Sequence, residues 1–401
     1  MNDTMALEGI RVIELTTGAA GPTVAKCLGE YGAEVIKIES RQRPDSHRGG
    51  PNDGRLNKSP DFVKLSRNKK DVTINMRSER GKALVKDLIR VSDVVVENFS
   101  LGVMERWGMG YEQLRELKPD IILIRLKGLG NTGPYADHVT YGPNLLALFG
   151  MTYLWNHPNA AAATGEARTQ HPDFMSGIAG AAAVMSALLY REQTGKGQCI
   201  DSAQVETGAS LLGPSYLDYV VNHHDPKPRG NLQPGAAPHG AYPTLGDDKW
   251  CVISVQNDGQ WLRLREATGL AEDPRFATLL GRTRHRAELD TLVSDWTRRH
   301  SGEEIMQILQ AAGIAAAPVQ DVEDQLSHNE QFAARGLFTS LAEPEMGPII
   351  TESPPVKMSE TPPRLFRHAP LIGEHTDQVL REALHLSEPE IRELTEQGVL
   401  D

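Results

Sequence analysis

Residues 11–15 read RVIEL, residues 34–38 read EVIKI, and the segment between them, 22–31, has helical spacing with a proline at its first position. Short β-branched runs predict strands, and proline is favoured in the first turn of a helix. The alternation continues with predicted strands at 93–96 and 120–126 and predicted helices at 78–91 and 101–117. Strands that are apolar throughout and separated by helices are typical of a parallel sheet covered on both faces. The sequence therefore predicts an α/β fold.

The second half of the chain starts with a predicted helix, 173–191, that is crowded with glycine and alanine. A stretch rich in proline, glycine and histidine follows at 223–243 and indicates a linker or an ordered crossing loop. Beyond it the pattern predicts a smaller α/β unit, with strands at 250–255 and 314–319 and helices at 261–268, 285–299 and 302–312. An amphipathic helical tail is predicted from Asp377 onward.

The charge and composition of the chain argue against several classes of protein. The 401 residues include 42 Lys and Arg against 53 Asp and Glu, a formal net charge of −11, which disfavours a phosphate-tracking nucleic-acid binder. Three cysteines, Cys27, Cys199 and Cys251, predict neither a disulfide framework nor a metal cluster. We find no secretory signal, and the longest alanine-rich run, 177–190, is interrupted by Ser186, so no membrane span is predicted. We expect a cytoplasmic protein.

Two segments have the composition of a phosphate or nucleotide site. The basic cluster 64–70 (KLSRNKK) fits either a pocket for a phosphorylated small molecule or a solvated loop. Residues 128–133 (GLGNTG) match the dinucleotide pattern G-x-G-x-x-G, but Pro134 follows at once and no helix is predicted there. We therefore do not expect a nicotinamide or flavin site. His223 and His224 are adjacent and cannot share one helix face, so no metal site is predicted from them either.

Asp173 is the carboxylate that stands out, because it lies just before the helix of small residues. An aspartate in this position is commonly an N-cap. The helix dipole and the free N–H groups also hold such a carboxylate ionised, which suits a nucleophile. Both roles stay open on these grounds alone.

Taken in order, several motifs resemble the family III CoA-transferases, the group that contains formyl-CoA transferase, carnitine CoA-transferase and the α-methylacyl-CoA racemases. The resemblance runs from about Leu7 to Thr376. It is carried by LEGIRVIEL (7–15), Gly21-Pro22, YGAEVIKIE (31–39), LSRNKKD (65–71), VENFSLGVMERWGM (96–109), 128–134, TGKGQCID (194–201), PHGAY (238–242) and GEHT (373–376).

The resemblance implies that Asp173 is the catalytic aspartate, which is acylated to a mixed anhydride and then carries CoA as an aspartyl thioester. It also implies that coenzyme A is bound as a substrate, with no further cofactor and no metal. The CoA positions that carry over by motif are Arg67, Lys69, Lys70, Asn98, Phe99, Arg106 and Trp107. Arg and Lys side chains suit the phosphates, and an aromatic ring suits the adenine.

Two departures from the family bear on the substrate. Tyr141 stands where the racemases have a proton-shuttling histidine, which favours transfer. Ala19 stands where formyl-CoA transferase has an active-site glutamine, which disfavours formyl or oxalyl transfer. We therefore expect Ala19, Tyr141, His239 and the segment 153–170 near the acyl site, and a dicarboxylic acid such as succinate, malate or a substituted succinate as substrate. A racemase, for which His138 would be a candidate base, one subunit of a heteromeric transferase and a dinucleotide enzyme remain as alternatives.

The resemblance also predicts the arrangement of the chain. We expect a Rossmann-like large domain over 1–212, a linker over 213–225, a small domain over 226–325 and a return to the large domain over 326–401. The expected assembly is an interlocked homodimer, with a heteromer as the alternative. The expected partners are an acyl-CoA and a carboxylic acid, with neither nucleic acid nor membrane.

Overall fold

The computed structural model describes residues 4–49, 54–158 and 171–400. The chain divides into two compact units. The larger unit contains the N-terminal part up to Met151, the region up to His224 and the C-terminal part from Ala334. The smaller unit contains Asp225–Ala333 together with a short stretch that begins at Thr152.

A six-stranded parallel sheet forms the centre of the larger unit. Its strand order is β3-β2-β1-β4-β5-β6, the order also found in open dinucleotide-binding sheets. The strands are β1 (Arg11–Leu15), β2 (Glu34–Glu39), β3 (Lys69–Thr73), β4 (Val94–Glu97), β5 (Ile122–Lys127) and β6 (Cys199–Ala203). The predicted α/β class and parallel sheet are confirmed.

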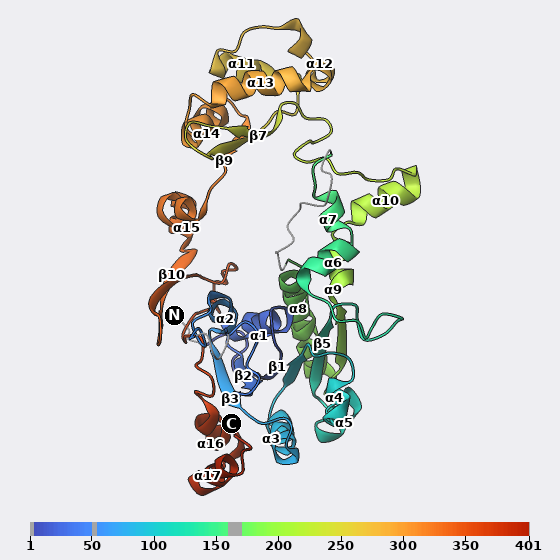
Figure 1. Ribbon diagram of the computed structural model, residues 1–401, viewed down its shortest axis with the longest axis vertical. Helices are drawn as coiled ribbons and strands as arrows, with labels where there is room; N and C mark the ends of the chain where they lie inside the picture. Colours follow the sequence, from blue (N-terminus) through green and yellow to red (C-terminus); the bar gives the residue numbers. More distant parts are fainter. Residues whose placement is uncertain (1–3, 50–53, 159–170, 401) are drawn as a thin grey trace. The chain divides into compact units, whose positions relative to one another are not determined.

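The two faces of the sheet are covered by different sets of helices (Figure 1). On one face α1 (Ala20–Glu30) and α8 (His171–Thr194) pack on the apolar side chains of β1, β2, β4 and β5. The other face carries α3 (Glu79–Arg90), α4 (Val103–Arg106), α5 (Tyr111–Leu117), α16 (Thr376–Leu384) and α17 (Glu388–Glu396). Because side chains alternate along a strand, β1, β2, β4 and β5 each contribute to both cores.

Strand β3 is one of the elements that the sequence did not reveal. The interpretation of residues 64–70 as a basic loop is wrong, because the segment contains the end of α2 (Pro60–Ser66) and the start of β3. All five residues of β3 are buried, although three of them are Lys69, Lys70 and Asp71. Their charges are matched by partners from distant segments, and a local pattern contains no trace of those partners.

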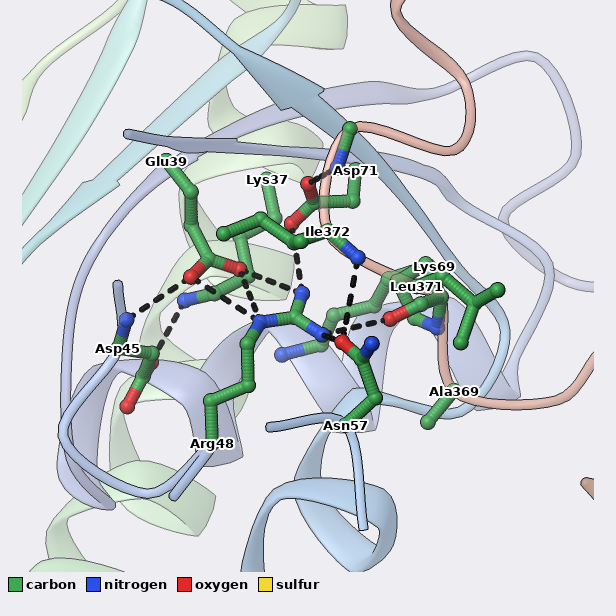
Figure 2. A network of polar contacts seen from close by, with 12 residues as sticks. Lys37, Glu39, Asp45, Arg48, Asn57, Lys69, Asp71, Ala369, Leu371 and Ile372 are labelled. Atoms are coloured by element: carbon green, nitrogen blue, oxygen red, sulfur yellow. Dashed lines mark hydrogen bonds and ion pairs between the residues drawn. The ribbon is translucent and has the colours of Figure 1, made fainter. Parts of the chain in front are cut away.

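Two of those charges, Lys69 and Asp71, belong to a buried polar network on the sheet face that α1 covers (Figure 2). The Arg48 guanidinium contacts Glu39 at 2.7 Å and Asp71 at 3.0 Å, and it also donates to the carbonyl of Pro370 at 2.8 Å. Asp71 in turn accepts from the backbone N–H of Gly373 at 2.6 Å. The network therefore attaches the C-terminal segment to the edge of the sheet.

The remaining elements of the larger unit connect these layers. They are α6 (Gly142–Leu148), α7 (Met151–Leu154), which continues into the smaller unit, α9 (Gln204–Ser210), α10 (Gly213–Asn222), α15 (Glu330–Arg335), which begins in the smaller unit, and the hairpin of β10 (Phe338–Glu343) with β11 (Gly347–Glu352). The prediction of a linker over 213–225 is wrong, because most of this segment forms α10. The sequence GPSYLDYVVN has helical spacing, and its proline occupies the first turn.

The smaller unit is an antiparallel sheet with helices on one face. Strand β8 (Trp250–Ser254) lies between β7 (His239–Pro243) and β9 (Ala315–Pro318). Its core is closed mainly by α11 (Asp258–Thr268), α13 (Arg286–Thr297) and α14 (Gly302–Ala311). Helix α12 (Leu279–Arg284) and single turns at Pro274–Phe276 and Asp324–His328 complete the helical content of this unit. The predicted strands and helices of this region are present within a few residues.

Helix α8 is close enough to α1 for glycine to be required at the contact. Measured from an ideal Cβ at Gly177, the Cβ of Thr23 is 2.5 Å away and the carbonyl oxygen of Ala20 is 3.0 Å away. By length and composition alone α8, with a mean hydropathy of 1.4, could cross a membrane, which the sequence analysis did not expect. In this fold it lies side by side with α1 and contacts β5 (Figure 1).

We predict that Gly177→Ala destabilises the larger unit by about 1–3 kcal/mol, as overpacking of a filled contact does. Helix propensity alone would give the opposite sign, because alanine is about 1 kcal/mol better than glycine inside a helix. Thermal unfolding of the full chain measures the change. Gly259→Ala in α11 is the control, since a Cβ there meets only ordinary contacts, at 3.4 Å and 3.7 Å. Equal stability of the two variants would contradict this account of the α1–α8 contact.

Candidate active site

The strand order reverses between β1 and β4, and in sheets of this kind ligands bind beyond the carboxyl ends of the strands at that point. Two hydrogen bonds join the ends of β1 and β4 at this point. Asn98, which follows β4, accepts from the backbone N–H of Thr17 at 3.0 Å and donates to its carbonyl at 2.8 Å. The turn after β1 is thereby attached to the end of β4.

The turn after β1, residues 16–19, leads directly into α1. Gly18 has a φ of +75°, a backbone conformation that glycine adopts without strain. The backbone N–H of Gly18 donates to the carboxylate of Asp45 at 3.1 Å, and the Lys37 ammonium donates to the carbonyl of Thr16 at 3.0 Å. No side chain caps the start of α1, which is left with its first N–H groups at this edge of the sheet.

Asp173 lies at the same end of the larger unit as this turn. Gly177 of α8 meets Ala20 and Thr23 of α1, and Gly180 meets Val24, so the two helices run in the same direction. One helical turn before Gly177 is Asp173, and one turn before the Ala20–Thr23 contact is the 16–19 turn. The beginnings of α1 and α8 therefore flank the switch point together.

Asp173 is a half-buried carboxyl in the first turn of α8, which the structure describes from His171. It therefore lies inside the helix, and the interpretation of Asp173 as the N-cap is wrong. Burial raises the pKa of Asp173 to about 6, although its own backbone N–H lowers the pKa in part. The neighbouring Phe174 ring lies 5.1 Å from the ammonium of Lys64, an exposed side chain of α2. This member of the basic cluster thus reaches the start of α8.

Three other members of the cluster are used by the fold. The Arg67 guanidinium is fully buried and contacts Glu30 at 2.9 Å and Glu352 at 3.2 Å. Lys69 is also fully buried and pairs with Glu14 at 2.8 Å. The ammonium of Lys70 contacts Glu34 at 2.7 Å and Glu382 at 3.1 Å. Phosphate contacts from these three residues stay a prediction and would require these ion pairs to open.

The predicted CoA residues after β4 have separate environments. The Asn98 carboxamide is engaged by Thr17, as described above. The rings of Phe99 and Trp107 pack edge to face, with their centroids 5.2 Å apart, against the core on the α3 side. Arg106 is exposed at the end of α4, and no ion pair joins it to a carboxylate in the described part of the chain.

The expected acyl-site residues are divided between the two units. Ala19 is buried and directly precedes α1, whereas Tyr141 is 74% exposed and precedes α6. In the smaller unit His239 lines a cavity of about 430 Å³ on the open face of the sheet, where its Nδ1 lies 2.9 Å from the Ser254 hydroxyl. Of the segment 153–170, residues 159–170 lie outside the described residues. The acyl-site assignment stays a prediction.

Two alternatives from the sequence can be placed in the structure. After Gly133 the chain forms turns until α6 begins at Gly142, so the helix that a dinucleotide fingerprint requires does not follow the third glycine. His138 is largely exposed and stacks on Tyr135 with ring centroids 5.1 Å apart. Among the described residues no group of three or more His, Cys, Asp or Glu is arranged to hold a metal ion.

The family model for CoA-transferase family III matches residues 7–376. The chain belongs to this family. Succinyl-CoA–D-citramalate CoA-transferase of Chloroflexus aurantiacus is 32% identical over 98% of this chain and 98% of its own length. Succinate–glutarate CoA-transferase of Agrobacterium fabrum is 33% identical over 94% of this chain and 95% of its own length. A crystal structure of a CAIB/BAIF family protein from Brucella suis superposes with a TM-score of 0.85 at 31% identity, over 94% of this chain and 99% of that one.

Several residues around the site of this family III transferase escaped the sequence analysis. Lys37 and Asp45, which hold the 16–19 turn, were not singled out, nor was the approach of Lys64 to Phe174. One signal was available, because charged side chains stand within the β-branched strands at Glu14 and Lys37. A charge inside a buried strand requires a partner, but the sequence does not say which one.

Because the pKa of Asp173 is raised in the folded chain, we predict that the stability of the protein depends on pH. The folded chain holds this proton up to about pH 6, whereas the unfolded chain releases it near the ordinary value of 3.8. The stability of the natural protein should therefore fall, relative to that of Asp173→Asn, as pH rises through this window. We expect the variant to have the higher melting temperature at pH 8, with no such advantage at pH 4.

Calorimetry at a series of pH values tests this expectation. Glu360→Gln, at an exposed position, is the control and should follow the natural protein throughout. A melting temperature of Asp173→Asn that is lower than that of the natural protein at pH 8 would contradict the assigned cause of the shift.

Proposed function

We propose that this family III CoA-transferase moves CoA between short dicarboxylic acids and uses Asp173 as the covalent nucleophile. The observation that carries the proposal is the position of Asp173, half-buried in the first turn of α8 beside the switch-point turn. The names of the relatives support the substrate class, since those quoted above are transferases for succinate, citramalate and glutarate. Two further relatives are named as the alpha and beta subunits of a succinyl-CoA–L-malate CoA-transferase.

The proposed reaction needs one carboxylate and no net proton transfer. A carboxylate oxygen of Asp173 bonds to the thioester carbonyl carbon, and collapse of the resulting oxyanion breaks the C–S bond and releases CoA thiolate. The thiolate attacks the aspartyl carbonyl of the anhydride, which releases the donor acid as a carboxylate and leaves aspartyl-CoA. The acceptor carboxylate then repeats these two steps in reverse order, which yields the new acyl-CoA and regenerates Asp173. Covalent catalysis of this type divides one difficult transfer into easier ones.

The electrostatics around Asp173 suit this chemistry. Its pKa of about 6 leaves the carboxyl ionised at neutral pH, as a nucleophile must be. Because the carboxylate is partly removed from water, less of its hydration has to be lost before attack. Racemisation at the α-carbon would need a second acid or base on the opposite face, whereas transfer does not.

We further propose that the phosphates of CoA meet Arg106 and Lys64, the exposed cations of the two predicted CoA segments. Each lies in the last turn of a short helix, Arg106 in α4 and Lys64 in α2. Unlike Arg67 and Lys69, which neutralise buried carboxylates, these side chains are open to solvent. Charge-assisted contacts of this kind contribute about 1.5–3 kcal/mol each.

A reciprocal pair of variants tests the assignment. Asp173→Ala should abolish transfer and leave the Kd for CoA within about twofold, because it removes the nucleophile only. Arg106→Ala should raise the KM for the CoA ester about tenfold or more, as expected for a lost phosphate contact. In that variant, hydroxylamine trapping and peptide mapping should still find a hydroxamate on Asp173, formed when hydroxylamine displaces the donor acid or CoA. Normal turnover by Asp173→Ala would exclude the covalent role, and an unchanged KM in Arg106→Ala would exclude the phosphate contact.

We also propose that the chain functions as a homodimer. Helix α10 has no buried residue in the single chain, and it exposes Leu217, Val220 and Val221 to 65%, 67% and 68%. On α8 of the same unit Ile178 and Leu189 are exposed to 60% and 61%. Apolar surface of this extent on a soluble enzyme indicates a protein interface, which a second copy of the chain would cover.

The proposed dimer is tested by light scattering on the purified protein. We expect the mass of two chains for the natural sequence and of one chain for the double variant Leu217→Asp, Val221→Asp. Val91→Asp, which places the same charge at an exposed position after α3, should leave the dimer intact. A natural protein with the mass of one chain would contradict the proposal.

A further inference from the structure

The 16–19 turn beside Asp173 is held by a buried ion pair between Asp45 and Lys37. Asp45 accepts from the backbone N–H of Gly18 through Oδ1 at 3.1 Å, and the hydroxyl of Thr17 lies 3.4 Å from the same oxygen. Through Oδ2 it accepts from the Lys37 ammonium at 2.8 Å (Figure 2). One carboxylate thus joins the turn to the sheet.

Lys37 has no freedom to release this carboxylate. It is fully buried, and its three N–H donors are taken by Asp45 at 2.8 Å, Glu14 at 3.2 Å and the carbonyl of Thr16 at 3.0 Å. Burial opposes the charged form, but the Asp45 and Glu14 carboxylates outweigh it and hold the pKa of Lys37 above its usual value. Burial likewise opposes the charge of Asp45, yet the Lys37 ammonium holds its pKa below the usual value.

Two further hydrogen bonds, each through a backbone N–H group, hold Asp45 in place. Its N–H donates to Glu39 at 2.8 Å, and its Oδ1 accepts from the N–H of His47 at 2.9 Å. The side chain therefore cannot follow the turn if the turn moves. A carboxylate held on both sides in this way keeps the N–H of Gly18, and with it the start of α1, in one position.

We propose that Asp45 is a positioning residue for acyl transfer, in that it holds the 16–19 turn so that backbone N–H groups at the start of α1 face the oxyanion formed when Asp173 attacks the thioester. This inference rests on the proposed covalent role of Asp173. In that attack the new C–O bond forms as the carbonyl π pair moves onto oxygen, and the negative charge is lost again when the C–S bond breaks. Donors held in place for such an oxyanion lower the barrier because they need no reorganisation.

A second carboxyl group of the network serves as a control that distinguishes a loss of turn positioning from a loss of folding stability. Asp71 is a fully buried carboxyl of the same network, but its oxygens accept from Arg48 and from the Gly373 N–H instead of from the turn. Asp45→Asn and Asp71→Asn each replace one buried carboxyl group of the network by an amide. Only the first loosens the turn.

The test is single-turnover acylation of full-length protein by succinyl-CoA, read by mass spectrometry, together with steady-state kinetics. Asp45→Asn should slow acylation and lower kcat about 10- to 100-fold, less than the effect of deleting an oxyanion donor outright, with the Kd for CoA within twofold. Asp71→Asn should lose melting temperature but keep its acylation rate within about threefold. An acylation rate in Asp45→Asn within threefold of the natural rate, or an equal loss in both variants, would overturn the inference.

A second variant covers the case in which Asp45→Asn does not fold. Thr17→Val removes the hydroxyl that contacts Asp45 and Ser46 and leaves the buried ion pair in place. It should slow acylation about three- to tenfold at an unchanged melting temperature, and an unchanged acylation rate would count against the inference. Absence of any label on Asp173 in the natural protein would instead overturn the covalent role itself, so the two failures are distinguishable.

Discussion

Two buried ammonium groups, those of Lys37 and Lys69, lie inside the sheet face that α1 covers, and Glu14 is the carboxylate that contacts both. Removal of one partner from such a group leaves an uncompensated charge in the core, which typically costs about 3–5 kcal/mol. The strands β1, β2 and β3 are therefore tied to one register by charge as well as by backbone hydrogen bonds. The turn after β1 and the loop that carries Asp45 take their positions from this pairing.

The same network explains how the two ends of the chain meet. Arg48 and Asp71 hold the carbonyl of Pro370 and the N–H of Gly373, which follow them by about 300 residues. Burial and the neighbouring Glu39 raise the pKa of Asp71, while Glu39 stays ionised because the Asp71 hydrogen bond, Lys37 and Arg48 outweigh its own burial. The Arg48 guanidinium contacts both carboxyl groups and keeps this cluster compact. The C-terminal helices α16 and α17 can then complete the core on the other face of the sheet.

The candidate site follows from the topology of the sheet. A parallel sheet places the beginnings of its crossover helices at the carboxyl edge, and here α1 and α8 begin side by side at the point where the strand order reverses. Helix N-termini favour negative charge, whereas burial of the Asp173 carboxyl disfavours it. A carboxylate between these opposing influences is ionised at neutral pH without being strongly stabilised, which is what a nucleophile in a family III transferase requires.

The sequence by itself determined the class of the fold and the positions of four strands of the large sheet and of the main helices of both units, and the ordered motifs of the family led to the prediction that Asp173 is the nucleophile. These properties depend on periodicity and on short motifs, which are local. It did not reveal that β3, β7, β10 and β11 are strands or that α10 replaces a linker, and for the basic cluster 64–70 it left a phosphate pocket and a solvated loop open. The cations Arg67, Lys69 and Lys70 are buried because Glu30, Glu14 and Glu34 neutralise them, and those partners lie 36 to 55 residues earlier in the chain. Only the tertiary structure decided which charge meets which, because a buried ion pair is a property of two distant segments and neither segment encodes it alone.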